Sequence, residues 1–314
     1  MIDTNSEPQT IWIDCDPGLD DAAAILMALG LKRNFRVLGL SSVAGNVGLE
    51  ETTRNACGVL ALAGRSDIPV YAGCPRAMMS GDMRAPRIHG ADGIGGVRLP
   101  EGEPPVAGTH AVSALIEASR TAGKAGLTLV ITGPMTNVAC AIVAAPDIVS
   151  CWRRVVFMGG VAFEAGNVTD YAEFNILADP HAASLTLDAV QDSGVELVMA
   201  GLDVTRKVPL TDARIRAMRD IGNPASQALA DMMTAYRSNV DKAVLHDACT
   251  IAWLAAPDYF GGTIGRLMID YTMGIRMGAV TVTERATPEG GALILSEVDD
   301  TRFYMLLTDA LKAL

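Results

Sequence analysis

The stretch "IWIDCDPGLDDAAAILMAL", residues 11–29, follows an apolar run with a cluster of acidic side chains and then an alanine-rich apolar run. Its pattern predicts a buried strand over 10–15 and a helix over 19–30, joined by a Pro-Gly turn. Like charges this close repel one another, so the cluster needs a partner that neutralises it. The acidic residues are Asp14, Asp16, Asp20 and Asp21.

Clusters of carboxylate oxygens suit a hard divalent cation, either Ca²⁺ or Mg²⁺. A bound cation would remove the mutual repulsion and make the crowding favourable. Asp16 and Asp21 lie on either side of the turn, which can aim both carboxylates at one point. The alternative is ordinary capping of a helix N-terminus by Asp, which accounts for one or two of these residues.

The rest of the chain alternates short apolar runs with helical patterns. Strands are expected at 10–15, 36–43, 127–132, 154–158 and 195–200, and helices at 19–30, 48–63, 136–145 and 180–190. Strands that are apolar on both faces and joined by helices indicate a parallel sheet covered on both sides. We predict one α/β domain over 1–314, a doubly wound, mostly parallel sheet flanked by helices, with 1–9 as a flexible tail.

Three further segments have recognisable patterns. Residues 75–108 are rich in Gly and Pro, and 205–245 read as helical with one polar face, so both are predicted to cover a site, as a loop and a helical cap. Ordinary surface structure is the alternative for each. Near the C-terminus, "GAVTVTE" and "ALILSEV" predict a hairpin, and "FYMLLTDALKAL" predicts a closing helix.

Composition excludes several classes of protein. A net charge of -11 argues against nucleic-acid binding. The 6 Cys residues are scattered, which is typical of reduced thiols in a cytoplasmic protein. The polar, acidic N-terminus is unlike a signal peptide, and no stretch approaches the ~18 apolar residues of a membrane span. We therefore expect a cytoplasmic protein that acts on small molecules.

Small polar residues follow each of the predicted strands. Ligands of open α/β sheets bind outside the carboxyl ends of the strands, so these residues are candidates for a site. Turn chemistry accounts for any one such group, but less well for five in succession. The five segments are "DCDPGLDD", "AGN" ending in Asn46, "TGPMTN" beginning with Thr132, "GNVTDYAEFN" with Asn167, Glu173 and Asn175, and "GLDVT" with Asp203.

A second acidic point lies far along the chain, in "VLHDACTIAWLAA". Here His246 and Asp247 precede an apolar helix. Histidine is the side chain best suited to donate a proton near neutral pH, so His246 is a candidate general acid. His89, in the Gly-rich "RIHGADGIGG", is a candidate for the mobile cover of the site.

Taken together, "DCDPGLDDA", "AGN", "TGPMTN", "GNVTDYAEFN" and "LHDACT" resemble, in their order, the nucleoside hydrolases of inosine-uridine type. The resemblance runs from about 11 to 256. It implies a Ca²⁺-dependent enzyme that hydrolyses the N-glycosidic bond of ribonucleosides to ribose and a free purine or pyrimidine base. It also implies a homodimer or homotetramer.

The resemblance assigns roles residue by residue. It implies that Ca²⁺ is held by Asp16, Asp21, Asp247 and the carbonyl of Thr132, with Asp14 positioning the turn from behind. It implies a water at the metal, deprotonated by Asp16, that attacks C1′ through an oxocarbenium-like transition state while His246 protonates the leaving base. The predicted substrate-binding residues are Asp20, Asn46, Asn167, Glu173, Asn175 and His89.

Several readings stay open. "DCDPG" after a strand also resembles the nucleophile loop of haloacid-dehalogenase-type phosphatases, although Gly18 occupies the place where that scheme wants Thr or Val. A nucleoside-binding or regulatory protein on the same scaffold is the non-enzymatic alternative. The preference for purine or pyrimidine is open, with Tyr236 and Gln227 as candidate contacts to the base.

Overall fold

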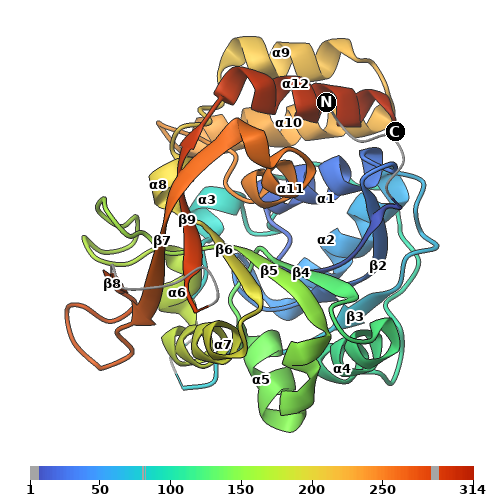
Figure 1. Ribbon diagram of the computed structural model, residues 1–314. Helices are drawn as coiled ribbons and strands as arrows, with labels where there is room; N and C mark the ends of the chain where they lie inside the picture. The colour runs from blue at the N-terminus through green and yellow to red at the C-terminus, as the bar shows by residue number, and fades with distance from the viewer. Residues whose placement is uncertain (1–6, 80, 82, 284–289) are drawn as a thin grey trace.

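The computed structural model describes residues 7–79, 81, 83–283 and 290–314. Within these residues the strands form one sheet in the order β3-β2-β1-β4-β5-β6-β9-β7-β8 (Figure 1). Their bounds are β1 Gln9–Cys15, β2 Phe35–Ser42, β3 Val70–Ala72, β4 Leu127–Ile131, β5 Trp152–Met158, β6 Glu196–Ala200, β7 Phe260–Ile269, β8 Val280–Thr283 and β9 Ala292–Val298. The pairs from β3 to β9 are parallel, and β7 pairs antiparallel with β9 and β8.

Helices follow most strands. They are α1 Leu19–Gly30, α2 Leu49–Leu62, α3 Pro86–His89, α4 Ala111–Ala122, α5 Thr136–Ala144, α6 Phe174–Ala178, α7 Pro180–Ser193, α8 Leu202–Thr205, α9 Asp212–Asp220, α10 Pro224–Asn239, α11 Ala248–Ala255 and α12 Asp300–Lys312, with 3₁₀ turns η1 Pro146–Cys151 and η2 Pro257–Tyr259. None of the described helices combines the length and apolarity needed to span a bilayer. The mostly parallel sheet with flanking helices confirms the predicted fold class.

The sheet separates two hydrophobic cores. Alternate residues of one strand face opposite cores, as Val155 and Val156 of β5 do. One core is filled by α1, α2 and α10–α12, and the other by α4, α5 and α7, on the opposite face of the sheet (Figure 1). Both faces of the central strands are thus buried, which is why their sequences are apolar without alternation.

The strand order places a topological switch point beside β1. From β1 the chain winds outward through β2 to β3 and then returns to β4 on the other side of β1. Helices on opposite sides therefore diverge between the carboxyl ends of β1 and β4, the position at which open sheets bind ligands. The acidic turn at 16–21 and Thr132 both lie there.

Two sequence-based predictions need correction. The C-terminal hairpin is wrong: β8 pairs with β7, while β9 inserts between β6 and β7. The antiparallel strand β7 was not predicted, because "FGGTIGRLMI" is broken by glycines. The predicted tail, 1–9, overlaps β1, which begins at Gln9, and its residues 1–6 lie outside the described part of the chain.

Candidate active site

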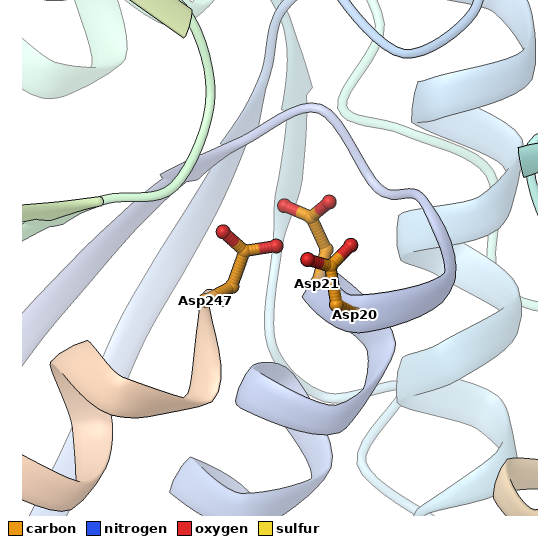
Figure 2. A group of neighbouring side chains, drawn as sticks. All are labelled: Asp20, Asp21 and Asp247. Atoms are coloured by element: carbon orange, nitrogen blue, oxygen red, sulfur yellow. The ribbon is translucent and has the colours of Figure 1, made fainter. Parts of the chain in front are cut away.

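Four buried carboxylates, from Asp16, Asp20, Asp21 and Asp247, form what we call the acidic floor. Asp20 and Asp21 stand in the first turn of α1, and Asp247 directly precedes α11. Figure 2 shows the side chains of these three converging, and one oxygen of each lies within 4.8 Å of the others. The fold thus joins two distant acidic segments at the carboxyl end of β1.

One buried oxygen of Asp16 has no partner in the part of the chain that the structure describes. Its Oδ2 accepts a hydrogen bond from the backbone N–H of Asn46 at 2.7 Å, whereas its Oδ1 has no partner among the described residues. Glycine is needed at two positions around this carboxylate. A Cβ on Gly45 would lie 2.0 Å from Oδ2, and one on Gly133 would lie 2.7 Å from Oδ1. The cradle therefore holds Asp16 in place while Oδ1 keeps an unused acceptor capacity.

Asp21 links three strand ends. Its Oδ2 accepts from the Gly18 N–H at 2.9 Å and from the Asn46 side-chain amide at 3.2 Å. Its Oδ1 accepts from the Thr132 hydroxyl at 2.8 Å. The turns after β1, β2 and β4 are thereby fixed to one carboxylate.

Asp14 lies within β1, behind the floor. Its Oδ1 accepts from the hydroxyl of Ser41 and from the side-chain amide of Asn137 at 2.9 Å. Burial raises the pKa of Asp14 to about 7, against the effect of these two hydrogen bonds. The contacts tie the acidic turn to β2 and α5.

Burial and mutual repulsion act together on the floor. Burial, then the charge of Asp21, raises the pKa of Asp20 to about 7. The pKa values of Asp16 and Asp247 are raised well above the ordinary range, first by burial and then by the neighbouring carboxylates. A bound cation would keep these carboxylates ionised, and oxygen ligands at this density fit a hard divalent cation. The Oδ1 of Asp16, which has no partner among the described residues, supports the same conclusion.

The three converging carboxylates, which we call the convergent group, are those of Asp20, Asp21 and Asp247. The group contains Asp20, which the sequence assigned to the substrate. It does not contain Asp16, which the sequence assigned to the metal. The carbonyl of Thr132, the other predicted ligand, accepts a hydrogen bond from the Asn175 side chain at 2.7 Å.

A pocket opens above the floor. It is lined by Asp20, Asn46, Ala85, Ile88, His89, Thr132, Met158, Asn167, Glu173, Phe174, Asn175, Tyr236, His246 and Asp247. The fold therefore brings every predicted substrate-binding residue to one pocket, together with His246. Asp14, Asp16 and Asp21 are buried and are not among its lining residues.

Glu173 and Asn175 line one side of the pocket and also hold local structure. Glu173 caps α6: its Oε1 accepts from the N–H of Asn175 at 2.9 Å, and its Oε2 from the N–H groups of Gly160 at 2.8 Å and Ile176 at 3.2 Å. Asn167 lies on the preceding loop, where its Oδ1 accepts from the Phe174 N–H at 3.1 Å. These side chains enter the pocket already oriented.

The opposite side, which we call the neutral rim, consists of His89, Tyr236 and His246. His89 of α3 stacks on Tyr236 of α10, with ring centroids 6.2 Å apart, and its Nδ1 accepts from the Leu19 N–H at 3.1 Å. Burial lowers the pKa of His89 to about 3, and burial with the charge of Arg206 lowers the pKa of His246 to about 4. Both imidazoles are therefore neutral at pH 7.

The rim agrees with the two predicted covers, since α3 lies in 75–108 and α10 in 205–245. Of the two candidate base contacts, Tyr236 lines the pocket and Gln227 does not. Gln227 stands two and a half turns from Tyr236 and is exposed on the opposite face of α10. Thr205, whose hydroxyl lies 2.8 Å from His246 Nδ1, was missed, although it belongs to the strand-end segment "GLDVT".

Comparison with known proteins identifies a family that matches almost the whole chain. The sequence profile of the inosine-uridine preferring nucleoside hydrolases matches residues 11–305. The pyrimidine-specific ribonucleoside hydrolase RihA of Salmonella paratyphi B is 39% identical over 313 residues, covering 96% of this chain and 98% of the relative.

Solved structures share the whole fold. The plant nucleoside hydrolase PpNRh1 superimposes with a TM-score of 0.89 at 27% identity, covering 98% of this chain and 100% of the plant chain. The purine-preferring ribonucleoside hydrolase of Gardnerella vaginalis gives 0.89 at 29% identity, covering 97% of this chain and 98% of the other.

The fold and site define an α/β enzyme whose pocket lies over a carboxylate cluster at the switch point of a parallel sheet. The chain belongs to the inosine-uridine preferring nucleoside hydrolase family. This assignment replaces both the phosphatase and the non-enzymatic alternatives.

Proposed function

We propose that this chain hydrolyses the N-glycosidic bond of ribonucleosides with the help of Ca²⁺. The observation that carries the proposal is the pocket itself, which sets amide and carboxylate groups directly over a buried floor. In this floor Asp16 Oδ1 has no partner among the described residues. One relative is named for pyrimidine and one for purine ribonucleosides, so the shared part of their substrates is the ribose. The base preference of this chain stays open.

Asp21, Asp247 and the Thr132 carbonyl would hold the ion, joined by Asp16 through its free Oδ1 and by Asp20 from the convergent group. The chemistry that Ca²⁺ supplies when bound is neutralisation of these carboxylates and a lower pKa for water. We propose Ca²⁺ rather than Mg²⁺ because Ca²⁺ accepts a shell of about eight oxygens and Mg²⁺ does not.

The protein's own residues would act on two developing charges. As the C1′–N bond breaks, the ribose becomes positive and the base negative. Carboxylates below the ribose would oppose the first charge, and Asp16 would accept a proton from the attacking water through Oδ1, which has no hydrogen-bond partner among the described residues. His246 faces the second charge. Because its ring is neutral, we propose that it first donates its remaining N–H to the base as a hydrogen bond.

The ribose would be held by the predicted substrate-binding side chains. Asn46, Asn167 and Asn175 supply amides, and Asp20 and Glu173 supply carboxylates, all lining the pocket. His89 would close the pocket from the rim. The cytoplasmic location remains a prediction from composition, and the dimeric or tetrameric state remains a prediction from the resemblance.

A nucleoside panel tests the proposal. Purified protein is incubated with purine and pyrimidine ribonucleosides, with Ca²⁺ or with a chelator, and free base and reducing sugar are measured. We expect ribose and base in equal amounts, released only with the metal. Calorimetric binding of nucleosides without product would contradict hydrolysis.

A further inference from the structure

The short helix α8 and Arg206, which follows it, contact both sides of the pocket. On one side lies the loop 160–173, which carries Asn167 and Glu173. On the other lies the segment with His246. We propose that residues 202–206 act as one positioning element, which holds the substrate loop and fixes the ring of His246. The inference rests on the proposed function and goes beyond it, because none of these residues lines the pocket.

Asp203 anchors the start of the loop. It is buried, and each of its carboxylate oxygens accepts one backbone N–H at 2.8 Å, Oδ2 from Ala162 and Oδ1 from Phe163. The adjacent Leu202 donates its N–H to the Gly160 carbonyl at 2.9 Å. Asp203 is separate from the acidic floor, and its hydrogen bonds are those of an anchor.

Arg206 holds the next residues of the same loop. Its guanidinium donates to the Glu164 carboxylate at 3.1 Å and to the carbonyls of Ala165 at 2.7 Å and Gly166 at 3.1 Å. Its contacts therefore end one residue before Asn167. A planar fork with several donors suits three acceptors at fixed positions, which a lysine does not match.

Thr205 acts on the opposite side. Its Oγ1 lies 2.8 Å from His246 Nδ1, and its backbone N–H is already used in a hydrogen bond to the Gly201 carbonyl. When the hydroxyl donates to Nδ1, the ring proton resides on Nε2. We assign this tautomer to His246, with its Nε2–H available to the leaving base.

A comparison of leaving groups separates positioning from mere structural support. Thr205→Val removes the hydroxyl and keeps the shape. We expect kcat on inosine and uridine to fall about 10-fold, the usual effect of one hydrogen bond, with KM unchanged. p-Nitrophenyl riboside, whose leaving group needs no donor, should be spared. Thr186→Val is the matched control, since Thr186 is a buried residue of α7 whose hydroxyl has no partner among the described residues.

The hydrogen bonds that hold the loop are tested through KM. Asp203→Asn keeps one acceptor oxygen and should raise KM about 10-fold, equally for both kinds of substrate. If this variant does not fold by circular dichroism, Arg206→Lys replaces it with the same expectation. Equal loss on both substrates in Thr205→Val, or an unchanged KM in the loop variants, would overturn the proposal.

The tautomer of His246 can be observed directly, without measuring turnover. In ¹⁵N NMR of the histidine-labelled protein, His246 should show the Nε2–H tautomer in wild type and a mixture in Thr205→Val. The Nδ1–H tautomer in wild type would overturn the assignment. If wild type instead releases no base from any ribonucleoside while the NMR result holds, the proposed function fails and the positioning of His246 stands.

Discussion

The acidic floor and the neutral rim face each other across one pocket and are built in opposite ways. The floor crowds ionisable oxygens together at strand ends, and burial pushes their pKa values up. The rim brings one imidazole and one phenol from the covering segments together with His246, which precedes α11, and burial lowers the pKa values of both imidazoles. Burial thus favours neutral groups on both sides, and only the floor has the ligands for a cation that restores its charge.

We infer from this difference that the two sides of the pocket stabilise opposite charges in the reaction. Four ionised carboxylates outweigh the charge of one divalent cation, so a loaded floor can still stabilise positive charge on the ribose. A neutral rim can donate hydrogen bonds to a negative base without attracting the ion. Imidazole is a poor Ca²⁺ ligand, so His246 can stand beside Asp247 and stay free.

The largest effect is expected from the floor. Asp21→Ala removes the carboxylate that links three strand ends and abolishes the predicted ion site. We expect activity to fall by roughly 10³-fold or more, because metal assistance supplies several kcal/mol. Ca²⁺ binding by calorimetry should disappear with it. The control is Asp231→Ala, an exposed aspartate paired with Arg219 on the surface, and tight Ca²⁺ binding retained in Asp21→Ala would refute the assignment.

The next effect is expected from the rim. His246→Ala should slow inosine and uridine hydrolysis by about 10²–10³-fold, the cost of losing one donor to a developing anion. p-Nitrophenyl riboside should be spared, and Ca²⁺ affinity should persist because the floor is intact. Steady-state kinetics with both substrates on one preparation measure this. Equal losses would mean that the ring only supports Asp247.

A smaller effect is expected at the ribose. Asn175→Ala removes an amide that lines the pocket and contacts the Thr132 carbonyl. The change should cost about 1–3 kcal/mol of transition-state binding. Measured kcat/KM should fall more for ribonucleosides than for 2′-deoxynucleosides, which should be poor substrates already. Comparable rates on inosine and 2′-deoxyinosine in wild type would contradict the proposal that the pocket holds the ribose through its hydroxyls.

The smallest effect is a pH dependence of stability. The folded pKa values of Asp14 and Asp20 are about 7, above the ordinary 3.8, so the folded state binds more protons than the unfolded state between these values. The free energy of unfolding of metal-free protein should therefore fall as pH rises from about 4 to 7. Thermal unfolding in a chelator should show a Tm that drops steadily over this range, and Ca²⁺ should restore it most at pH 7 and above. A flat profile would contradict the pKa shifts.

The floor was more predictable from sequence than the rim. Carboxylates after β1 and residues after β2, β4 and β5 had to meet because parallel strands end at one edge, and Asp247 was found beside a histidine. Sequence could not say whether Asp16 or Asp20 joins the convergent group, since that depends on side-chain directions in a turn. The composition of the rim depends on the rotational phase of α10, which directs Tyr236 into the pocket and Gln227 to the opposite, exposed face of the helix.

Fold prediction failed where pairing is not sequential. The parallel strands β1, β2 and β4–β6 were found because each is short, apolar and followed by polar residues. β7 was missed because its glycines and exposed positions mask the strand pattern. The hairpin assumed that neighbouring strands pair, whereas β7 takes both partners.

The central claim is that the floor binds one Ca²⁺ on which ribonucleoside hydrolysis depends. Its most direct test is titration of chelator-treated wild-type protein with Ca²⁺, following calorimetric heat and base release on the same sample. We expect no turnover without the ion and activity that rises with site occupancy to a maximum at one ion per chain. Full turnover in the metal-free sample would contradict it.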